Sequence, residues 1–200
     1  KMAKFQRKTR QERETEIKEA ALDVFVNKGY RNTTMEDIIA GTTLSKGGVY
    51  RYFSSPKEIM IAIMRDGNDV DNKFFREIGQ EINSKEDICN LLADRSLDKI
   101  LSTSPQKKLY LMFIYEILYD KKLEDIFLGF EKQTFIQLEN LFGDKISFFK
   151  DKNQEMSRLF MSRLINALLF VHALFSDKQI FESNRDYLHK IFFDFYNEYL

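Results

Sequence analysis

The sequence predicts an all-α protein of about nine helices, and three observations support that fold class. The 200 residues include only 2 prolines and 8 glycines, so long stretches contain neither of the residues that interrupt helices. Apolar side chains recur at the 3.6-residue spacing of a helix, and polar caps stand before several of these segments. Hydrophobic residues make up 44% of the chain, which is enough to bury a sizeable core.

The first helix is expected from about Thr9 to Lys28. Ile17, Ala21 and Phe25 fall on one face of this segment at helical spacing. Gly29 follows directly and is a natural left-handed C-cap, because glycine has no side chain to clash in that conformation.

The next two helices are short and close together in the sequence. Thr33 or Thr34 caps the first of them, each with an acidic residue three positions later, and this helix should end near Gly41. Residues 42–44 then form a tight turn, and Ser45 caps the helix that follows.

Ser55, Pro56 and Glu58 mark the start of a fourth helix. Ser55 caps it, Pro56 occupies the first helical position, where its missing N–H has no partner to lose, and Glu58 completes the capping box. This helix should run to about Gly79. Later helices are expected at about 84–102, 105–119, 122–142 (or as far as 149), 153–176 and 183–199.

Residue counts exclude several kinds of site. The single Cys89 rules out an internal disulfide and a multi-cysteine metal site, and two histidines, His172 and His189, make a histidine metal site improbable. Neither a catalytic nucleophile with a base nor a phosphate-binding glycine loop stands out, so no enzyme and no cofactor are expected. The longest apolar run, residues 164–175, is too short to cross a membrane. The chain is therefore expected to be soluble and cytoplasmic.

Charge is unevenly distributed although the totals balance. Residues 1–60 hold 12 Lys and Arg against 8 Asp and Glu, a net charge of +4, and the remainder holds 19 against 23, a net charge of −4. The first ten residues carry five basic side chains and no acid. They form either a solvated tail or an arm that touches DNA.

Residues 29–58 carry the densest functional signal. Three helices within about 45 residues, the second and third joined by a tight turn, form a helix-turn-helix, which places the third helix in the major groove of DNA. Gly47 and Gly48 are unexpected in the first turn of that helix, because each costs about 1 kcal/mol relative to alanine. Their missing side chains would let the backbone approach DNA, or the helix simply starts loosely. Tyr50 and Tyr52 fall outside the predicted core face, where they either meet DNA or pack partially.

This stretch resembles the tetracycline-repressor (TetR) family of bacterial regulators over about 50 residues. The residues that match the family signature are Gly29-Tyr30, Thr33-Thr34, Asp37-Ile38, Ser45-Lys46-Gly47, Val49-Tyr50, Tyr52-Phe53 and Lys57-Glu58. The turn departs from the family's Ala-Gly-Val, since this chain has Thr42-Thr43-Leu44, and Ile39 replaces the usual alanine. Without glycine, Thr43 must be either strained or in an ordinary conformation, so the tilt of the next helix could differ.

The resemblance implies an N-terminal DNA-binding domain, residues 1–55, and a C-terminal effector-binding and dimerisation domain, residues 56–200, with residues 56–79 as the connector. By resemblance Thr34, Tyr52 and Lys57 would hold phosphates. Residue types and resemblance together give ten candidate DNA-binding residues: Thr33, Thr34, Ser45, Lys46, Gly47, Gly48, Tyr50, Arg51, Tyr52 and Lys57.

The last two long helices are apolar over more than one face, which indicates burial on two sides. In the resembling family such helices form a four-helix dimer interface, so we expect a homodimer; the alternative is a monomer with a thick core. The candidate interface residues are Phe160, Leu164, Leu168, Val171, Phe175, Leu188, Ile191, Phe192 and Phe195.

The middle helices are rich in aromatic residues, which are core by default but also suit the walls of a pocket for a small apolar or aromatic effector. The candidate effector-binding residues are Phe74, Tyr110, Phe113, Tyr115, Tyr119, Phe130 and His172. The function expected by resemblance is a repressor that leaves a palindromic DNA operator when the effector binds. The alternative is a helical adaptor that binds only protein. The charge asymmetry and the sequence of residues 45–53 argue against it.

Overall fold

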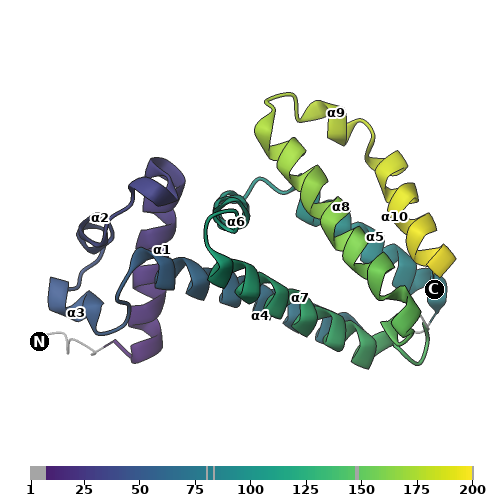
Figure 1. The fold of residues 1–200 in the computed structure, drawn as a ribbon, viewed down its shortest axis with the longest axis horizontal. Coiled ribbons are helices and arrows are strands. Elements are labelled where there is room, and N and C mark those ends of the chain that lie inside the picture. The colour runs from purple at the N-terminus through teal and green to yellow at the C-terminus, as the bar shows by residue number, and fades with distance from the viewer. Residues whose placement is uncertain (1–7, 80, 83, 147–148, 200) are drawn as a thin grey trace, which may run out of the picture. The chain divides into compact units, whose positions relative to one another are not determined.

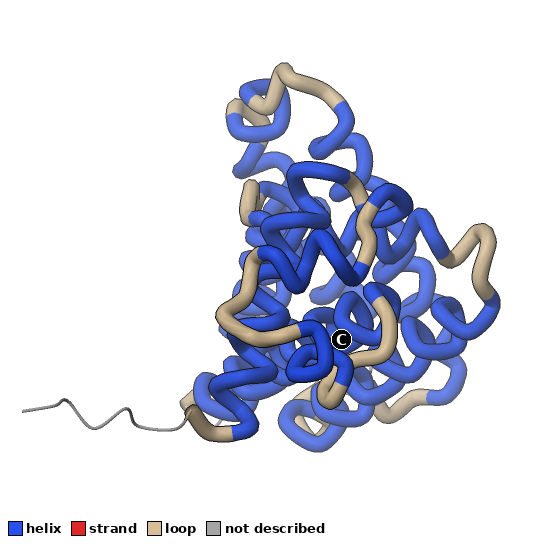
Figure 2. Tube along the Cα trace, turned by 90° about the vertical axis from the view of Figure 1, so that its left-hand side faces the viewer, coloured by secondary structure: helices blue, strands red, loops and turns tan. Residues whose placement is uncertain are grey.

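The computed structural model describes residues 8–199 except residues 80, 83 and 147–148. All regular secondary structure in that part of the chain is helical (Figure 1, Figure 2). The predicted all-α fold class is confirmed. The longer helices are α1 (Arg10–Lys28), α4 (Pro56–Gly79), α5 (Lys85–Leu101), α6 (Pro105–Glu116), α7 (Lys121–Phe142), α8 (Glu155–Leu174) and α10 (Arg185–Tyr199). The shorter ones are α2 (Met35–Ala40), α3 (Lys46–Tyr50), α9 (Gln179–Glu182) and the 3₁₀ turns η1 (Tyr30–Asn32) and η3 (Lys152–Gln154).

Most predicted helices agree with these bounds, and three details differ. Helix α6 ends at Glu116, and residues 117–119 form a turn, so the predicted helix to residue 119 is three residues too long. The extension of α7 to residue 149 is wrong, because α7 ends at Phe142. Helix α9 was not predicted, since four residues are too few to show a periodic pattern.

The chain divides into two compact units. Unit 1 comprises the residues up to Gly67 together with Pro105–Lys121, and unit 2 comprises Asn68–Ser104 and the residues from Lys122 onward. Unit 1 therefore contains α1, α2, α3, the first half of α4, and α6. The predicted boundary between residues 55 and 56 concerns function rather than packing, and it stays a prediction.

Unit 1 is built around α1, whose two ends are capped by Thr9 and Gly29. The Thr9 hydroxyl accepts a hydrogen bond from the backbone N–H of Glu12, whose carboxylate accepts one from the Thr9 N–H. Gly29 ends the helix at φ +83° and ψ 147°, a conformation open to glycine although not the left-handed helical one. Its N–H donates to the Phe25 carbonyl at 2.9 Å.

The core of unit 1 joins α1 to α2 and α6. Its fully buried side chains come from all five helices of the unit: Ile17, Ala21, Phe25, Ile38, Val49, Ile59, Met60, Leu109 and Phe113. Burying a Phe or Ile side chain contributes about 1.5–3 kcal/mol, so this shared core holds the short helices α2 and α3, which could not persist alone.

Unit 2 is organised around α5, which packs against α8 and α10. The buried residues of α5 include Ile88, Cys89, Leu97 and Ile100. A polar contact crosses this core: the Ser96 hydroxyl lies 3.0 Å from the Tyr196 hydroxyl of α10. Desolvation by burial raises the pKa of Tyr196 to about 12.

Candidate nucleic-acid interface

Helix α2 is capped by Thr34, one of the two cap residues that the sequence predicts. The Thr34 hydroxyl accepts a hydrogen bond from the Asp37 N–H at 3.2 Å, and the Asp37 carboxylate accepts from the Thr34 N–H at 2.8 Å. Lys28 also contacts this carboxylate at 2.6 Å, and hydrogen bonds from Lys28 and Thr34 lower the pKa of Asp37 to about 2. The start of α2 is thus fixed by local contacts, and Thr34 itself remains exposed.

Thr33, in contrast, does not present its side chain to the surface. It is only 8% exposed, and its hydroxyl donates to the Gly29 carbonyl at 2.8 Å. The structure therefore gives Thr33 a role in joining η1 to α2. A direct side-chain contact from Thr33 to DNA does not fit this burial, so the candidate set narrows to Thr34 at this position.

The turn between α2 and α3 is the place where the chain departs from the resembling family. Thr43 has an ordinary backbone conformation, because the part of the chain that the structure describes contains no positive-φ residue other than glycine. Glu16 of α1 reaches this turn: its carboxylate accepts from the Thr43 N–H at 2.7 Å and from the Thr43 hydroxyl at 2.5 Å. Arg13 adds a 3.0 Å contact to the same hydroxyl. The turn is therefore supported by α1 rather than by a glycine.

Helix α3 is short, and one cap and one buried residue hold it. The Ser45 hydroxyl accepts from the Gly48 N–H at 3.2 Å, which confirms the predicted cap. Val49 is completely buried and anchors the helix to the core. Lys46, Gly47 and Tyr50 of this helix are exposed.

The two glycines of α3 have different surroundings. A Cβ atom added at Gly47 would have no neighbour within 4 Å, whereas one added at Gly48 would lie 3.3 Å from both Leu44 Cδ2 and Ser45 Oγ. Gly47 thus faces open space, and Gly48 packs closely against the turn. The sequence alone could not separate these two roles.

The remaining candidates on and after α3 are accessible to different degrees. Lys46 and Arg51 are exposed, Tyr50 is 42% exposed, and Tyr52 is half-buried. Lys46 lies 2.9 Å from Glu36 of α2 and within 5.9 Å of the Tyr50 ring centre. Because both partners of this ion pair are well exposed, the pair is weak and Lys46 can exchange Glu36 for another anion.

Lys57, at the start of α4, is paired within unit 1. Its ammonium donates to the Asp120 carboxylate, which comes from the segment between α6 and α7. About a third of each side chain is exposed, at 32% for Lys57 and 29% for Asp120. Nothing in the sequence pattern pointed to Asp120.

The predicted effector-binding residues are divided between the two units. Tyr110, Phe113, Tyr115 and Tyr119 lie on α6 and the turn after it, in unit 1. Phe113 is core, whereas Tyr115 and Tyr119 are exposed. Their hydroxyls lie 3.2 Å apart, and the Arg31 guanidinium lies 4.2 Å from the centre of the Tyr119 ring.

The other three effector candidates belong to unit 2. Phe74 is half-buried and packs edge-on against Phe75. The Arg95 guanidinium lies 4.2 Å from the centre of the Phe74 ring. His172 is only 2% exposed and packs edge-on against Phe181. Phe130 is half-buried on α7. The abundance of aromatic residues grouped seven candidates that the fold divides between the two units.

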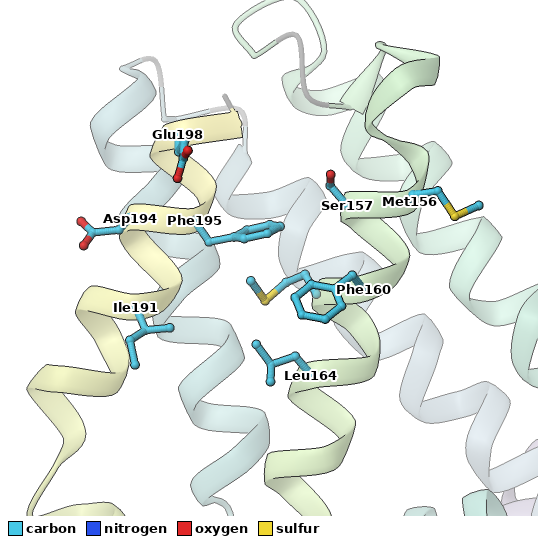
Figure 3. Close-up of a pocket in the computed structure, with 9 residues that line it drawn as sticks. Met156, Ser157, Phe160, Leu164, Ile191, Asp194, Phe195 and Glu198 are labelled. Atoms are coloured by element: carbon cyan, nitrogen blue, oxygen red, sulfur yellow. The ribbon is translucent and has the colours of Figure 1, made fainter.

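An apolar groove of about 650 Å³ lies between α8 and α10 (Figure 3). Phe160, Leu164 and Phe195 point toward it from the two helices, and Phe160 is 62% exposed. The predicted interface residues Val171, Phe175 and Ile191 are exposed as well, and Leu168 and Leu188 are half-buried. Phe192, the remaining predicted interface residue, has no exposed surface.

Phe192 is completely buried in its own chain, next in sequence to the exposed Ile191. Its assignment to a subunit interface does not fit this position, because a side chain without exposed surface cannot meet a partner. The exposed Met156 and Leu174 lie on the same helix as Phe160 and extend the apolar surface.

The described residues contain neither a membrane-spanning helix nor a cluster of metal-binding side chains. No helix in that part of the chain is long and apolar enough to cross a membrane. No group of three or more His, Cys, Asp or Glu side chains there is arranged to hold a metal ion. The predicted basic N-terminal arm falls mostly on residues 1–7, which lie outside the described residues.

Comparison with known proteins links the helix-turn-helix to a family. Residues 17–63 match the model of the bacterial regulatory proteins of the tetR family. The chain is 42% identical over 66 residues to the uncharacterized HTH-type transcriptional regulator YfiR of Bacillus subtilis, a match that covers 33% of this chain and 32% of that protein. It is 27% identical over 179 residues to an uncharacterized HTH-type transcriptional regulator in the lacX 3' region of Lactococcus lactis, covering 84% of this chain and 87% of that one.

Solved structures share the fold over nearly the whole chain. Salmonella enterica GusR superposes with a TM-score of 0.73 at 17% identity, covering 95% of this chain and 98% of that one. A transcriptional regulator from Saccharomonospora viridis, solved in complex with choline, gives a TM-score of 0.66 at 16% identity and covers 93% and 96%. The family match falls on residues 17–63 of α1 to α4, and solved structures share the fold over nearly the whole chain, so the N-terminal helix-turn-helix of this chain is of the tetR type.

Proposed function

We propose that this chain represses transcription by binding a palindromic operator as a homodimer, and that a small apolar or aromatic effector releases it. The observation that carries the proposal is the surface of α3. Val49 anchors the helix, while Gly47 faces open space and Lys46 and Tyr50 are exposed beside it. A short helix fixed by one buried residue, with a bare backbone and basic and aromatic side chains outward, suits the major groove.

Contacts on either side of α3 would position it on the duplex. The exposed Thr34 at the start of α2, and Tyr52 and Lys57 after α3, would hold backbone phosphates, which fix orientation without reading sequence. Lys46, Gly47 and Tyr50 would approach base edges. This function needs binding only, and we place it in the cytoplasm, where an operator is accessible.

Dimerisation would let two copies of α3 reach successive half-sites, which are separated by about 34 Å or a multiple of it. The exposed apolar side chains of α8 and α10 support a partner there, because apolar patches of this kind mark interaction surfaces. A second copy of the same two helices would cover Phe160, Leu164 and Phe195.

The effector would bind in the domain of residues 56–200. The support is the abundance of aromatic side chains and the shared fold with a regulator solved in complex with choline. An effector can shift DNA release only by its difference in affinity between the DNA-bound and released forms.

The decisive experiment measures binding of the full chain to its own upstream DNA by fluorescence anisotropy at stated salt, with a scrambled duplex as control. Specific binding should exceed binding to the scrambled duplex by at least about a thousandfold. Equal and weak affinity for both duplexes, lost at moderate salt, would refute the proposal and favour a protein-binding adaptor. Replacing Tyr50 with Ala should reduce the preference for the specific duplex more than the affinity for the scrambled one.

A further inference from the structure

Lys57 is the candidate phosphate contact that the structure shows already bound to an anion. Its ammonium donates to the Asp120 carboxylate within unit 1. We propose that Asp120 competes with the DNA backbone for Lys57, so that this carboxylate lowers operator affinity and reduces its salt dependence. The inference rests on the proposed function, since it needs Lys57 to contact a phosphate.

Asp120 is held near Lys57 by contacts of the preceding residues. The Glu116 carboxylate, at the end of α6, lies 2.7 Å from the Arg31 guanidinium, and Glu116 is largely buried. Tyr119 covers the same guanidinium at 4.2 Å. The end of α6 is therefore fastened to η1, and the segment that carries Asp120 starts from a fixed point.

The charges of the pair predict the direction of the effect. Lys57 gains little by exchanging a carboxylate for a phosphate, because both are anions that accept charge-assisted hydrogen bonds. If Lys57 moves to a phosphate, Asp120 is left without this cation and repels the DNA. If Lys57 stays with Asp120, one phosphate contact is lost. Either way the carboxylate weakens binding.

Salt dependence gives a second and independent signature. Each phosphate neutralised by a protein cation releases about 0.9 counterion from duplex DNA. A lysine that leaves an internal carboxylate exposes an anion that takes up a cation, so the net release is smaller. Removing the Asp120 charge should restore the full contribution of Lys57.

The test compares the wild-type chain with Lys57→Ala, Asp120→Asn and the double variant on the chain's own upstream DNA, between about 50 and 200 mM salt. Asparagine is chosen because Asp120 directly precedes α7, and asparagine caps a helix as well as aspartate does. Asp120→Asn should tighten binding by roughly three- to fivefold, the upper range for an ion pair with solvent access. The plot of log K against log salt should steepen by up to about one unit.

Two controls separate competition for Lys57 from the general effect of removing one negative charge from the protein. Asp23→Asn removes an exposed carboxylate of α1 in the same unit and should change affinity less than Asp120→Asn. In the Lys57→Ala background, Asp120→Asn should have no more effect than Asp23→Asn, because the competed cation is gone. Thermal melting checks that Asp120→Asn folds, and Asp120→Ser is the second charge-removing variant if it does not.

The outcomes distinguish this inference from the proposed function. If the wild-type chain shows no specific DNA binding, both the proposed function and the competition at Lys57 are refuted. If Lys57→Ala leaves the salt slope unchanged even in the Asp120→Asn background, Lys57 is not a phosphate contact and the inference falls with that assignment. If Lys57→Ala flattens the slope but Asp120→Asn behaves like Asp23→Asn, only the competition is refuted and the repressor stands.

Discussion

Glu16 and Thr43, separated by 27 residues, are joined by two hydrogen bonds in which the Glu16 carboxylate accepts from the backbone N–H and the hydroxyl of Thr43. These contacts connect α1 to the turn between α2 and α3. Hydrogen bonds from the Thr43 hydroxyl, the Lys8 ammonium and the Thr43 N–H lower the pKa of Glu16 from 4.5 to about 2. A single carboxylate thus supports the turn that precedes α3.

Glu16→Gln should destabilise the protein by roughly 1–2 kcal/mol at neutral pH, as expected when charge-assisted hydrogen bonds weaken. Since the folded-state pKa is lower than the unfolded value of 4.5, the stabilisation is present above pH 4.5 and is lost as pH falls toward 2. Urea unfolding at several pH values should therefore show the difference between wild type and variant shrinking below pH 4.5.

Glu19→Gln is the control for that series, because Glu19 is an exposed carboxylate on the same helix. It should change stability by less than about 0.5 kcal/mol. A Glu16→Gln penalty that persists unchanged at pH 3 would mean that the carboxylate charge does not support the turn.

Gly47→Ala and Gly48→Ala should separate DNA contact from packing. An alanine at Gly47 meets no neighbour within 4 Å, so it should stabilise the helix by up to about 1 kcal/mol. If the backbone of α3 approaches DNA, the same methyl group should weaken operator binding by about tenfold or more, corresponding to about 1.4 kcal/mol. Melting temperature and DNA affinity would then change in opposite directions.

Gly48→Ala provides the contrast, because its methyl group would lie 3.3 Å from Leu44 and Ser45 side-chain atoms. These neighbours must shift slightly, so the helix-propensity gain should be partly or fully cancelled. Equal DNA affinity for Gly47→Ala and wild type would contradict a close approach at Gly47.

Local signals made the helix-turn-helix predictable. Thr34 and Ser45 cap helices through contacts three residues away, and such contacts are readable in the sequence. The support of Thr43 by Glu16 was not readable, because many polar residues could have met that turn and only the fold brings Glu16 there. Asp120 escaped prediction for the same reason, since it lies 63 residues from Lys57.

Apolar patterns predicted helices but did not separate core from surface. Ile191 and Phe192 are neighbours on α10, yet Ile191 is exposed and Phe192 is buried. A helix that is apolar around most of its circumference gives no sequence signal for which side its own chain covers. The placement of α6 in unit 1 was also unpredictable, because its apolar residues would suit either core.

Phe160→Glu should dissociate the proposed homodimer. Phe160 is exposed and points toward the α8–α10 groove, so a carboxylate there would be buried against an apolar partner surface and strongly disfavoured (Figure 3). Sedimentation analysis should show monomer at concentrations where the wild type is dimeric. Val70→Glu, at an exposed valine of α4, should leave the dimer intact. A dimeric Phe160→Glu protein would place the interface elsewhere.

Tyr196→Phe tests the polar contact in the core of unit 2. The Ser96 hydroxyl donates to the Leu92 carbonyl at 2.8 Å, so the Tyr196 hydroxyl is the donor in its 3.0 Å contact with Ser96. Removing it should cost about 0.5–1.5 kcal/mol near neutral pH, the net worth of one hydrogen bond. Because Ser96 keeps the Leu92 contact, the variant should still fold.

The same substitution should improve tolerance of high pH. The folded-state pKa of Tyr196 is about 12, higher than the unfolded value of 10.0, so burial favours the neutral form. The neutral tyrosine is fully compatible with the fold below pH 10, and stability is lost as pH rises from 10 toward 12, because the unfolded chain ionises first. Tyr196→Phe removes that group, so its unfolding free energy should fall less than that of the wild type over this range. Parallel alkaline losses in both proteins would show that another group governs unfolding there.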